Sequence, residues 1–152
     1  MVLPIADYPI VDIEEPLLAP LLMTLEEMIR RYQRLLAVIQ QEKRLMIEGN
    51  LDDLFPCLAE KEGILGELKQ LEARRMDETH PLMKRFQIKR PGLMPLIDRV
   101  SVRYREPLLS CYNRLRALSA SVAEINQING LLVGRILRQV NGLLGLLTHL
   151  ST

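Results

Sequence analysis

A regular row of apolar residues from Leu108 to Leu150 constrains the fold more than any other feature of this chain. Its members recur three and four residues apart over six heptads, and eleven of the thirteen are apolar. This spacing predicts one long helix whose apolar row, here called the seam, packs against other helices as in a coiled coil. The seam consists of Leu108, Cys111, Leu115, Leu118, Val122, Ile125, Asn129, Leu132, Ile136, Gln139, Leu143, Leu146 and Leu150.

Two adjacent residues do not suit such a helix. Asn129 lies on the seam, where a buried amide costs stability and usually fixes the register or the choice of partner. Gly130 follows it, and glycine inside a helix costs about 1 kcal/mol relative to alanine. Asn126 and Asn129 therefore either contact a partner molecule or form hydrogen bonds between helices of this chain, and the sequence leaves both interpretations open.

The remaining sequence predicts an all-α fold. A chain of 152 residues is about one domain, and four Tyr, two Phe and no Trp are too few aromatic residues for a typical β-sandwich. We predict an antiparallel helical hairpin packed with a long C-terminal helix in a coiled-coil-like bundle. The predicted segments are an extended acidic tail (1–16), the hairpin (17–76) with its turn at Gly49-Asn50, a connector with a short helix (77–105) and the long helix (106–150).

The C-terminal helix is expected to be longer than the hairpin can cover. At 1.5 Å per residue it measures about 65 Å and each hairpin helix about 40 Å, so that about 25 Å should project. A second apolar row lies beside the seam there, together with further glycines at 134, 142 and 145. An apolar and weakly helical segment is typical of a site that folds on binding, although self-association would bury it equally well.

We therefore predict that a partner helix packs along the C-terminal segment by its own apolar face. Apolar residues would supply the contact, Asn129 would set the register, and the glycines would allow close approach. The predicted partner-binding residues are Asn126, Asn129, Gly130, Leu132, Val133, Ile136, Leu137, Val140, Leu144 and Leu147.

The charges are divided unequally along the chain. Residues 1–80 carry 9 Lys and Arg against 16 Asp and Glu, whereas residues 81–152 carry 11 against 3. The two halves either neutralise each other or the second half presents a basic surface to a partner. Nucleic acid is a poor candidate for that partner, because aromatic residues for base stacking are sparse and no reading module is present.

Residues suited to catalysis or metal binding are scarce. The only histidines, His80 and His149, lie about 70 residues apart, and a single carboxylate–His pair near His80 is half of what a metal site in a helical bundle uses. No glycine-rich phosphate loop follows a strand. We expect no enzyme activity, no cofactor and no metal.

The expected location is the cytoplasm. Cys57 and Cys111 are isolated and fit a reducing compartment. No Lys or Arg precedes Arg30, which is the wrong charge pattern for a secretory signal. Arg135 and Arg138 interrupt the best candidate for a membrane span. A helix lying on a membrane surface would need a polar face richer in Lys and Arg.

Two stretches of this sequence resemble the FlgN family. One is the hairpin phrase around Glu42, Gly49, Leu54, Lys61, Leu65, Leu68 and Arg75, which is weakly specific. The other, much more specific, is Asn126-Gln127-Ile128-Asn129-Gly130-Leu131-Leu132, which is similar to the family's Asn-x-x-Asn-Gly followed by apolar residues. Together they span about residues 17–150.

The resemblance implies a cytosolic export chaperone of the flagellar type III secretion system. Such a chaperone binds the C-terminal helical segments of the hook–filament junction proteins FlgK and FlgL and delivers them to the export gate, FlhA. Some family members carry a polar tail with a Tyr that docks to the gate, whereas the last Tyr here is Tyr112. The mode of docking is therefore left open, and a self-assembling coiled-coil scaffold is the alternative function.

Overall fold

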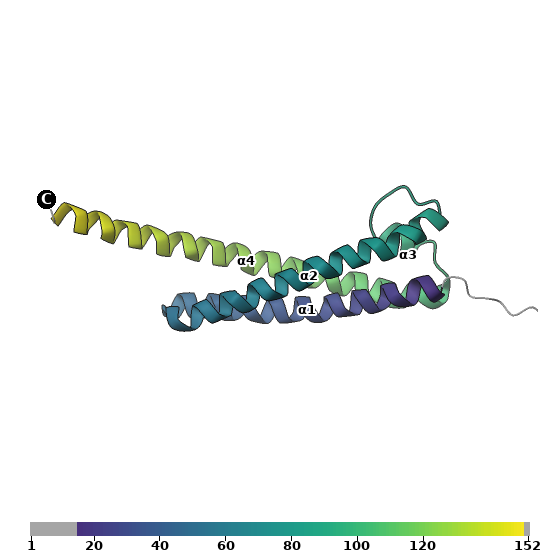
Figure 1. Cartoon of the computed structure of the whole chain (residues 1–152), viewed down its shortest axis with the longest axis horizontal. Helices are drawn as coiled ribbons and strands as arrows, with labels where there is room; N and C mark the ends of the chain where they lie inside the picture. The colour runs from purple at the N-terminus through teal and green to yellow at the C-terminus, as the bar shows by residue number, and fades with distance from the viewer. Residues whose placement is uncertain (1–14, 151–152) are drawn as a thin grey trace, which may run out of the picture.

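The fold is an all-α bundle, described by a computed structural model for residues 15–150. It contains α1 (Glu15–Glu48), α2 (Leu51–Arg85), α3 (Met94–Ile97) and α4 (Val102–Leu150), and no strand lies within that range. The helices α1 and α2 form an antiparallel hairpin, and α4 packs along α1 before it extends past the hairpin turn (Figure 1). The predicted fold class is confirmed.

The turn between α1 and α2 is built from the two residues that the sequence suggested. Gly49 adopts a positive φ of 71°, and the Gly49 and Asn50 amides donate to the Met46 and Leu45 carbonyls at 3.2 and 3.0 Å. This pattern is the Schellman ending of a helix, which favours glycine at that position. The Asn50 side chain then accepts from the Asp53 amide at 3.2 Å and caps α2.

The predicted connector 77–105 is wrong at both of its ends. Helix α2 continues to Arg85, and α4 begins at Val102, so only the stretch between them connects the helices. The error came from treating Pro81 and Pro107 as helix breakers. Both prolines are exposed. Each proline cannot donate a hydrogen bond to the carbonyl four residues before it. In both cases that carbonyl belongs to an exposed residue, so water can take the place of the missing donor.

The predicted tail is also too long, because α1 already begins at Glu15. Residues 1–14 lie outside the described part of the chain. Pro56 and Pro20 lie on exposed positions within their helices, as Pro81 and Pro107 do.

The core divides into two groups along α1. The base cluster joins the first half of α1 to the end of α2, α3 and the start of α4; the turn cluster lies near the hairpin turn. The base cluster contains Leu18, Leu21, Leu25, Met28, Ile29, Leu71, Leu82, Leu93, Leu96, Ile97, Val100, Tyr104, Leu108 and Cys111. The turn cluster contains Leu35, Val38, Ile39, Leu45, Met46, Leu54, Cys57, Ile64 and Leu68. Tyr32 packs against both.

Candidate partner-binding surface

The Asn-x-x-Asn motif takes part in a polar network inside the chain. Asn129 is 1% exposed, and its Nδ2 donates to the Ile39 carbonyl at 2.9 Å and to Glu42 Oε2 at 3.3 Å. Lys61 Nζ lies 3.1 Å from Glu42 Oε2 and donates to Asn126 Oδ1 at 3.1 Å. The network therefore joins α1, α2 and α4 at one level of the bundle.

Two of the predicted partner-binding residues, Asn126 and Asn129, take part in these contacts within the chain. The donor atoms of Asn129 are directed to α1, so in this structure its amide holds α4 in register within the bundle. Asn126 is exposed but accepts from Lys61. A direct contact of either side chain with a partner stays a prediction.

Gly130 and Gly134 have no tight neighbour in the chain. A Cβ at Gly130 would meet no atom within 4 Å, and one at Gly134 would approach only the end of the Arg138 side chain, at 3.9 Å. Close packing within the bundle therefore does not require either glycine. Both leave room for a molecule that approaches α4 from outside.

Coverage of α4 by the hairpin ends at two residues of the predicted site. Leu132 and Ile136 are partly buried and pack against the turn cluster. Every residue from 137 to 150 is exposed. These 14 residues form a helix about 21 Å long that extends beyond the hairpin turn (Figure 1).

The remaining predicted residues lie on or beside this projecting segment. Val133, Leu137 and Val140 are exposed, and Leu144 and Leu147 expose 55% and 62% of their surface. The structure also exposes three seam residues that sequence reasoning had left out of the site, namely Leu143, Leu146 and Leu150. Their heptad spacing could have identified them once the length of the hairpin was known.

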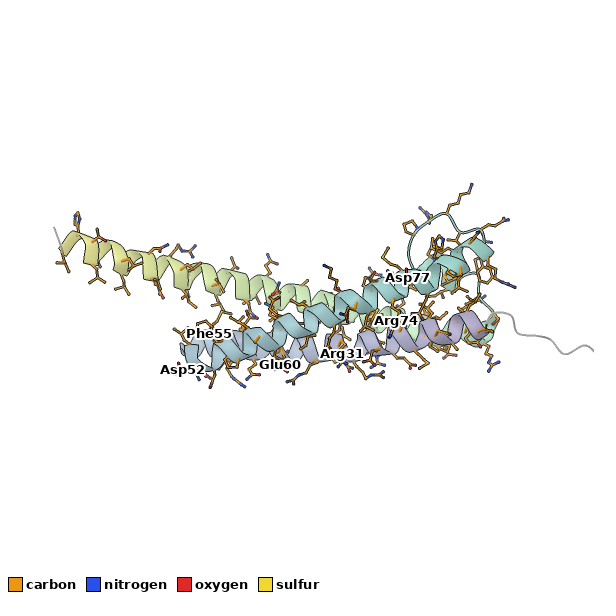
Figure 2. The ribbon with its side chains drawn as sticks, in the orientation of Figure 1. Arg31, Asp52, Phe55, Glu60, Arg74 and Asp77 are labelled. Atoms are coloured by element: carbon orange, nitrogen blue, oxygen red, sulfur yellow. The ribbon has the colours of Figure 1, made fainter. Side chains whose placement is uncertain are left out.

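A second group of exposed apolar side chains lies at the hairpin turn. Ile47, Leu51 and Phe55 are exposed, and Phe55 exposes 68% of its surface. Figure 2 shows Phe55 and Asp52 at this end of α2, where α4 leaves the hairpin. Sequence reasoning missed these residues, although Leu51 and Phe55 are four apart and off the buried Leu54–Cys57 face. Exposed apolar groups of this extent usually mark an interaction site.

Charges of opposite sign flank the apolar residues. No Asp or Glu follows Glu124 in the sequence, so α4 carries only the cations Arg135 and Arg138 near its exit from the hairpin. Asp52 and Asp53 are exposed at the hairpin turn. A partner helix with charges on both flanks of its apolar face would therefore be held in a preferred orientation.

The two cysteines belong to the core rather than to this surface. Cys57 and Cys111 are free and buried, one in each cluster. Burial raises the pKa of the Cys57 thiol, and burial likewise raises the pKa of the Cys111 thiol. Within residues 15–150, no group of three His, Cys, Asp or Glu side chains is placed to hold a metal ion.

The exposed apolar character of α4 is also evident in its hydropathy. The helix contains an 18-residue window with a mean hydropathy of 1.2, which is long and apolar enough to cross a membrane. None of that window is buried in the bundle. A core helix of a soluble protein can reach the same hydropathy, but its window would be mostly buried, whereas the described bundle leaves this one uncovered.

The comparisons with known proteins identify a family for this chain. A family model described as FlgN protein matches residues 17–152, which is nearly the whole chain. No curated protein and no solved structure matches this chain. Proteins of the FlgN family are soluble cytoplasmic chaperones, not enzymes, and they bind flagellar hook-associated proteins. The chain thus belongs to the FlgN family of flagellar export chaperones.

Proposed function

We propose that this chain is a cytoplasmic chaperone that binds the C-terminal helical segments of FlgK and FlgL and delivers them to the export gate, FlhA. The observation that carries the proposal is the projecting segment of α4, where all residues from 137 to 150 are exposed and half of them are Leu or Val. An apolar helix in water requires a partner, and an amphipathic helix is the simplest element that can cover it.

The partner helix would lie along the projecting segment and end against the hairpin turn. Leu144 and Leu147 would form the far part of the contact, and Phe55 the near part. Fully burying one Leu contributes about 1.5–3 kcal/mol, so several half-exposed residues together offset the cost of association, which is at least about 4 kcal/mol. Covering these residues would also keep the apolar face of the partner from self-associating before export.

Calorimetric titration with C-terminal fragments of FlgK and FlgL tests the proposal. The double variant Leu144→Glu, Leu147→Glu places two carboxylates in the contact, and we expect it to weaken binding by about 100-fold or more. Met76→Glu is the matched control, because Met76 is 59% exposed on α2, away from the projecting segment. It should bind as the unmodified chain does.

The outcome distinguishes the chaperone from a self-assembling scaffold. If the folded double variant binds the fragments with unchanged affinity, the site does not lie on the projecting segment. If the unmodified chain binds neither fragment and forms oligomers whose mass is unaffected by them, the scaffold function is supported instead. Delivery to the gate is tested separately, by co-sedimentation of the chaperone–fragment complex with the cytosolic part of FlhA.

A further inference from the structure

The end of the bundle opposite the hairpin turn carries an excess of basic residues. Residues 77–106 contain seven Lys or Arg against four acids, Asp77, Glu78, Asp98 and Glu106. We propose that the acidic segment 1–14 of the same chain docks on the surface formed by the basic residues. The basic surface consists of Lys84, Arg85, Lys89, Arg90, Arg99, Arg103 and Arg105.

Most of these cations have no counter-ion in the described part of the chain. All seven residues are exposed. Arg103 lies 5.5 Å from the centre of the Tyr104 ring, and Arg105 donates to the Val100 carbonyl at 3.2 Å. The side chains of the other five form no hydrogen bond or ion pair within residues 15–150. On α1, by contrast, the side chains of Arg30, Arg31 and Arg34 pair with glutamates.

The backbone of the α2–α3 connector brings several of the cations together. Gln87 has a φ of 53° and Gly92 a φ of 117°, both in the left-handed region, within a connector of turns and bends. A positive φ costs a residue such as glutamine about 1 kcal/mol or more, and packing must hold it in place. An open hollow between this connector and the residues around the end of α3 is lined by Lys89, Arg90 and Arg99, with Asp98 as the one acid in its lining.

Segment 1–14 has the complementary charge. It contains Asp7, Asp12 and Glu14 and no Lys or Arg. Apolar residues alternate with these acids, as at Ile10, Val11 and Ile13. The basic surface offers apolar contacts for them, since Val102 exposes 77% of its surface and Met94 is also exposed.

The segment is attached at the correct end of the molecule. Helix α1 begins at Glu15, and its first turns share the base cluster with α3 and the start of α4. Figure 1 shows the beginning of α1 at the same end of the bundle as α3 and the α2–α3 connector. Attachment at this short range gives an effective concentration on the order of millimolar, so weak charge–charge contacts suffice for docking.

The length of the segment also rules out the other exposed surface. Fourteen residues span at most about 50 Å when fully extended. Helix α1, with 34 residues, is about 51 Å long, and the projecting segment of α4 begins beyond its far end. Segment 1–14 therefore cannot cover the apolar end of α4, whereas the basic surface lies within reach.

Zero-length carbodiimide cross-linking of the full chain tests the docking. The reagent joins a carboxylate to a lysine amine in direct contact, and Lys84 and Lys89 provide the amines. We expect links from Asp7, Asp12 or Glu14 to these two lysines, and none above background to Lys43, near the hairpin turn. An equal mixture of isotopically labelled and unlabelled protein should yield links within single chains.

Charge variants distinguish specific docking from chance contact. Arg90→Glu with Arg99→Glu leaves both lysines in place and should lower the yield of these links by about fivefold. The matched control, Arg135→Glu with Arg138→Glu on α4, should leave the yield unchanged. The proposal is overturned if no such links form, if they join separate chains, or if the first pair of substitutions has no more effect than the second.

Discussion

At the scale of single residues, the most constrained group is the Glu42 carboxylate. Glu42 is 4% exposed, and Lys61 and Asn129 are its two partners. A buried carboxylate is tolerated only when cations and donors replace its water. The three residues come from three different helices, so the same contacts that stabilise the charge also fix the register of α4 against the hairpin.

This network predicts a large effect of removing the cation alone. Lys61→Met leaves Glu42 with Asn129 as its remaining partner and should lower the free energy of unfolding by about 2 kcal/mol, measured by urea denaturation. Adding Glu42→Gln removes the charge but keeps an oxygen for Asn129, so the double variant should be more stable than Lys61→Met. Strictly additive losses would show that Lys61 and Glu42 do not interact.

The exposed pair of Arg34 and Glu60 is the control for that measurement. It joins the same two helices of the hairpin, but both side chains are substantially exposed. Such pairs contribute about 0.2–1 kcal/mol, because water screens the charges. Arg34→Met should therefore have a smaller effect than Lys61→Met.

At the scale of the helix, α4 is one element with two environments. Up to Ile136 the seam packs on the hairpin, and from Leu137 onward the same spacing continues without a covering surface. Gly142 and Gly145 lie in the uncovered part, where a Cβ would meet no atom within 4 Å. Within residues 15–150, no packing at these two positions therefore offsets the low helix propensity of glycine.

We expect Gly142→Ala with Gly145→Ala to slow amide hydrogen exchange in the projecting segment. Each substitution adds about 1 kcal/mol of helix propensity, or about fivefold in local protection. The urea midpoint for global unfolding should not change, since every residue of the segment is exposed and none belongs to either core cluster. Gly49→Ala, at a φ of 71°, is the contrasting control and should lower that midpoint. Unchanged exchange would mean that these glycines do not limit the order of the segment.

The sequence predicted some features of the helices correctly and others not, because the spacing of apolar residues carries only part of the information. Apolar spacing predicted the hairpin, the long α4 and its uncovered end, because periodicity reports which face of a helix is buried. It could not predict that α2 continues through Pro81, since that depends on whether water reaches the freed carbonyl. It also could not decide between the two roles of Asn129, because the α1 atoms that accept from its amide are about 90 residues away in sequence.

At the scale of the whole molecule, two core clusters share the same three helices. The base cluster and the turn cluster each contain residues of α1 and α2, and residues of α4 belong to or pack against both. Each of these helices passes from one cluster to the other without a break, and Tyr32 contacts both. Neither cluster can lose its packing without releasing helices that the other needs, so the bundle should unfold as one cooperative unit.

The two cysteines test whether the two clusters unfold together, because Cys111 lies in the base cluster and Cys57 in the turn cluster. Burial raises the pKa of each thiol, so the reactive thiolate forms mainly after unfolding, when the pKa returns to about 8.5. Because each pKa is higher in the folded state, the stability that the buried thiols contribute is present below about pH 8.5 and is lost as the pH rises above it.

Alkylation at a fixed pH and increasing urea should therefore begin at the same urea concentration for Cys57 and Cys111, measured peptide by peptide by mass spectrometry. Lys61→Met should shift both transitions equally, although its network contacts only the turn cluster. Earlier labelling of Cys57 than of Cys111 would instead mean that the turn end opens independently while the base remains folded.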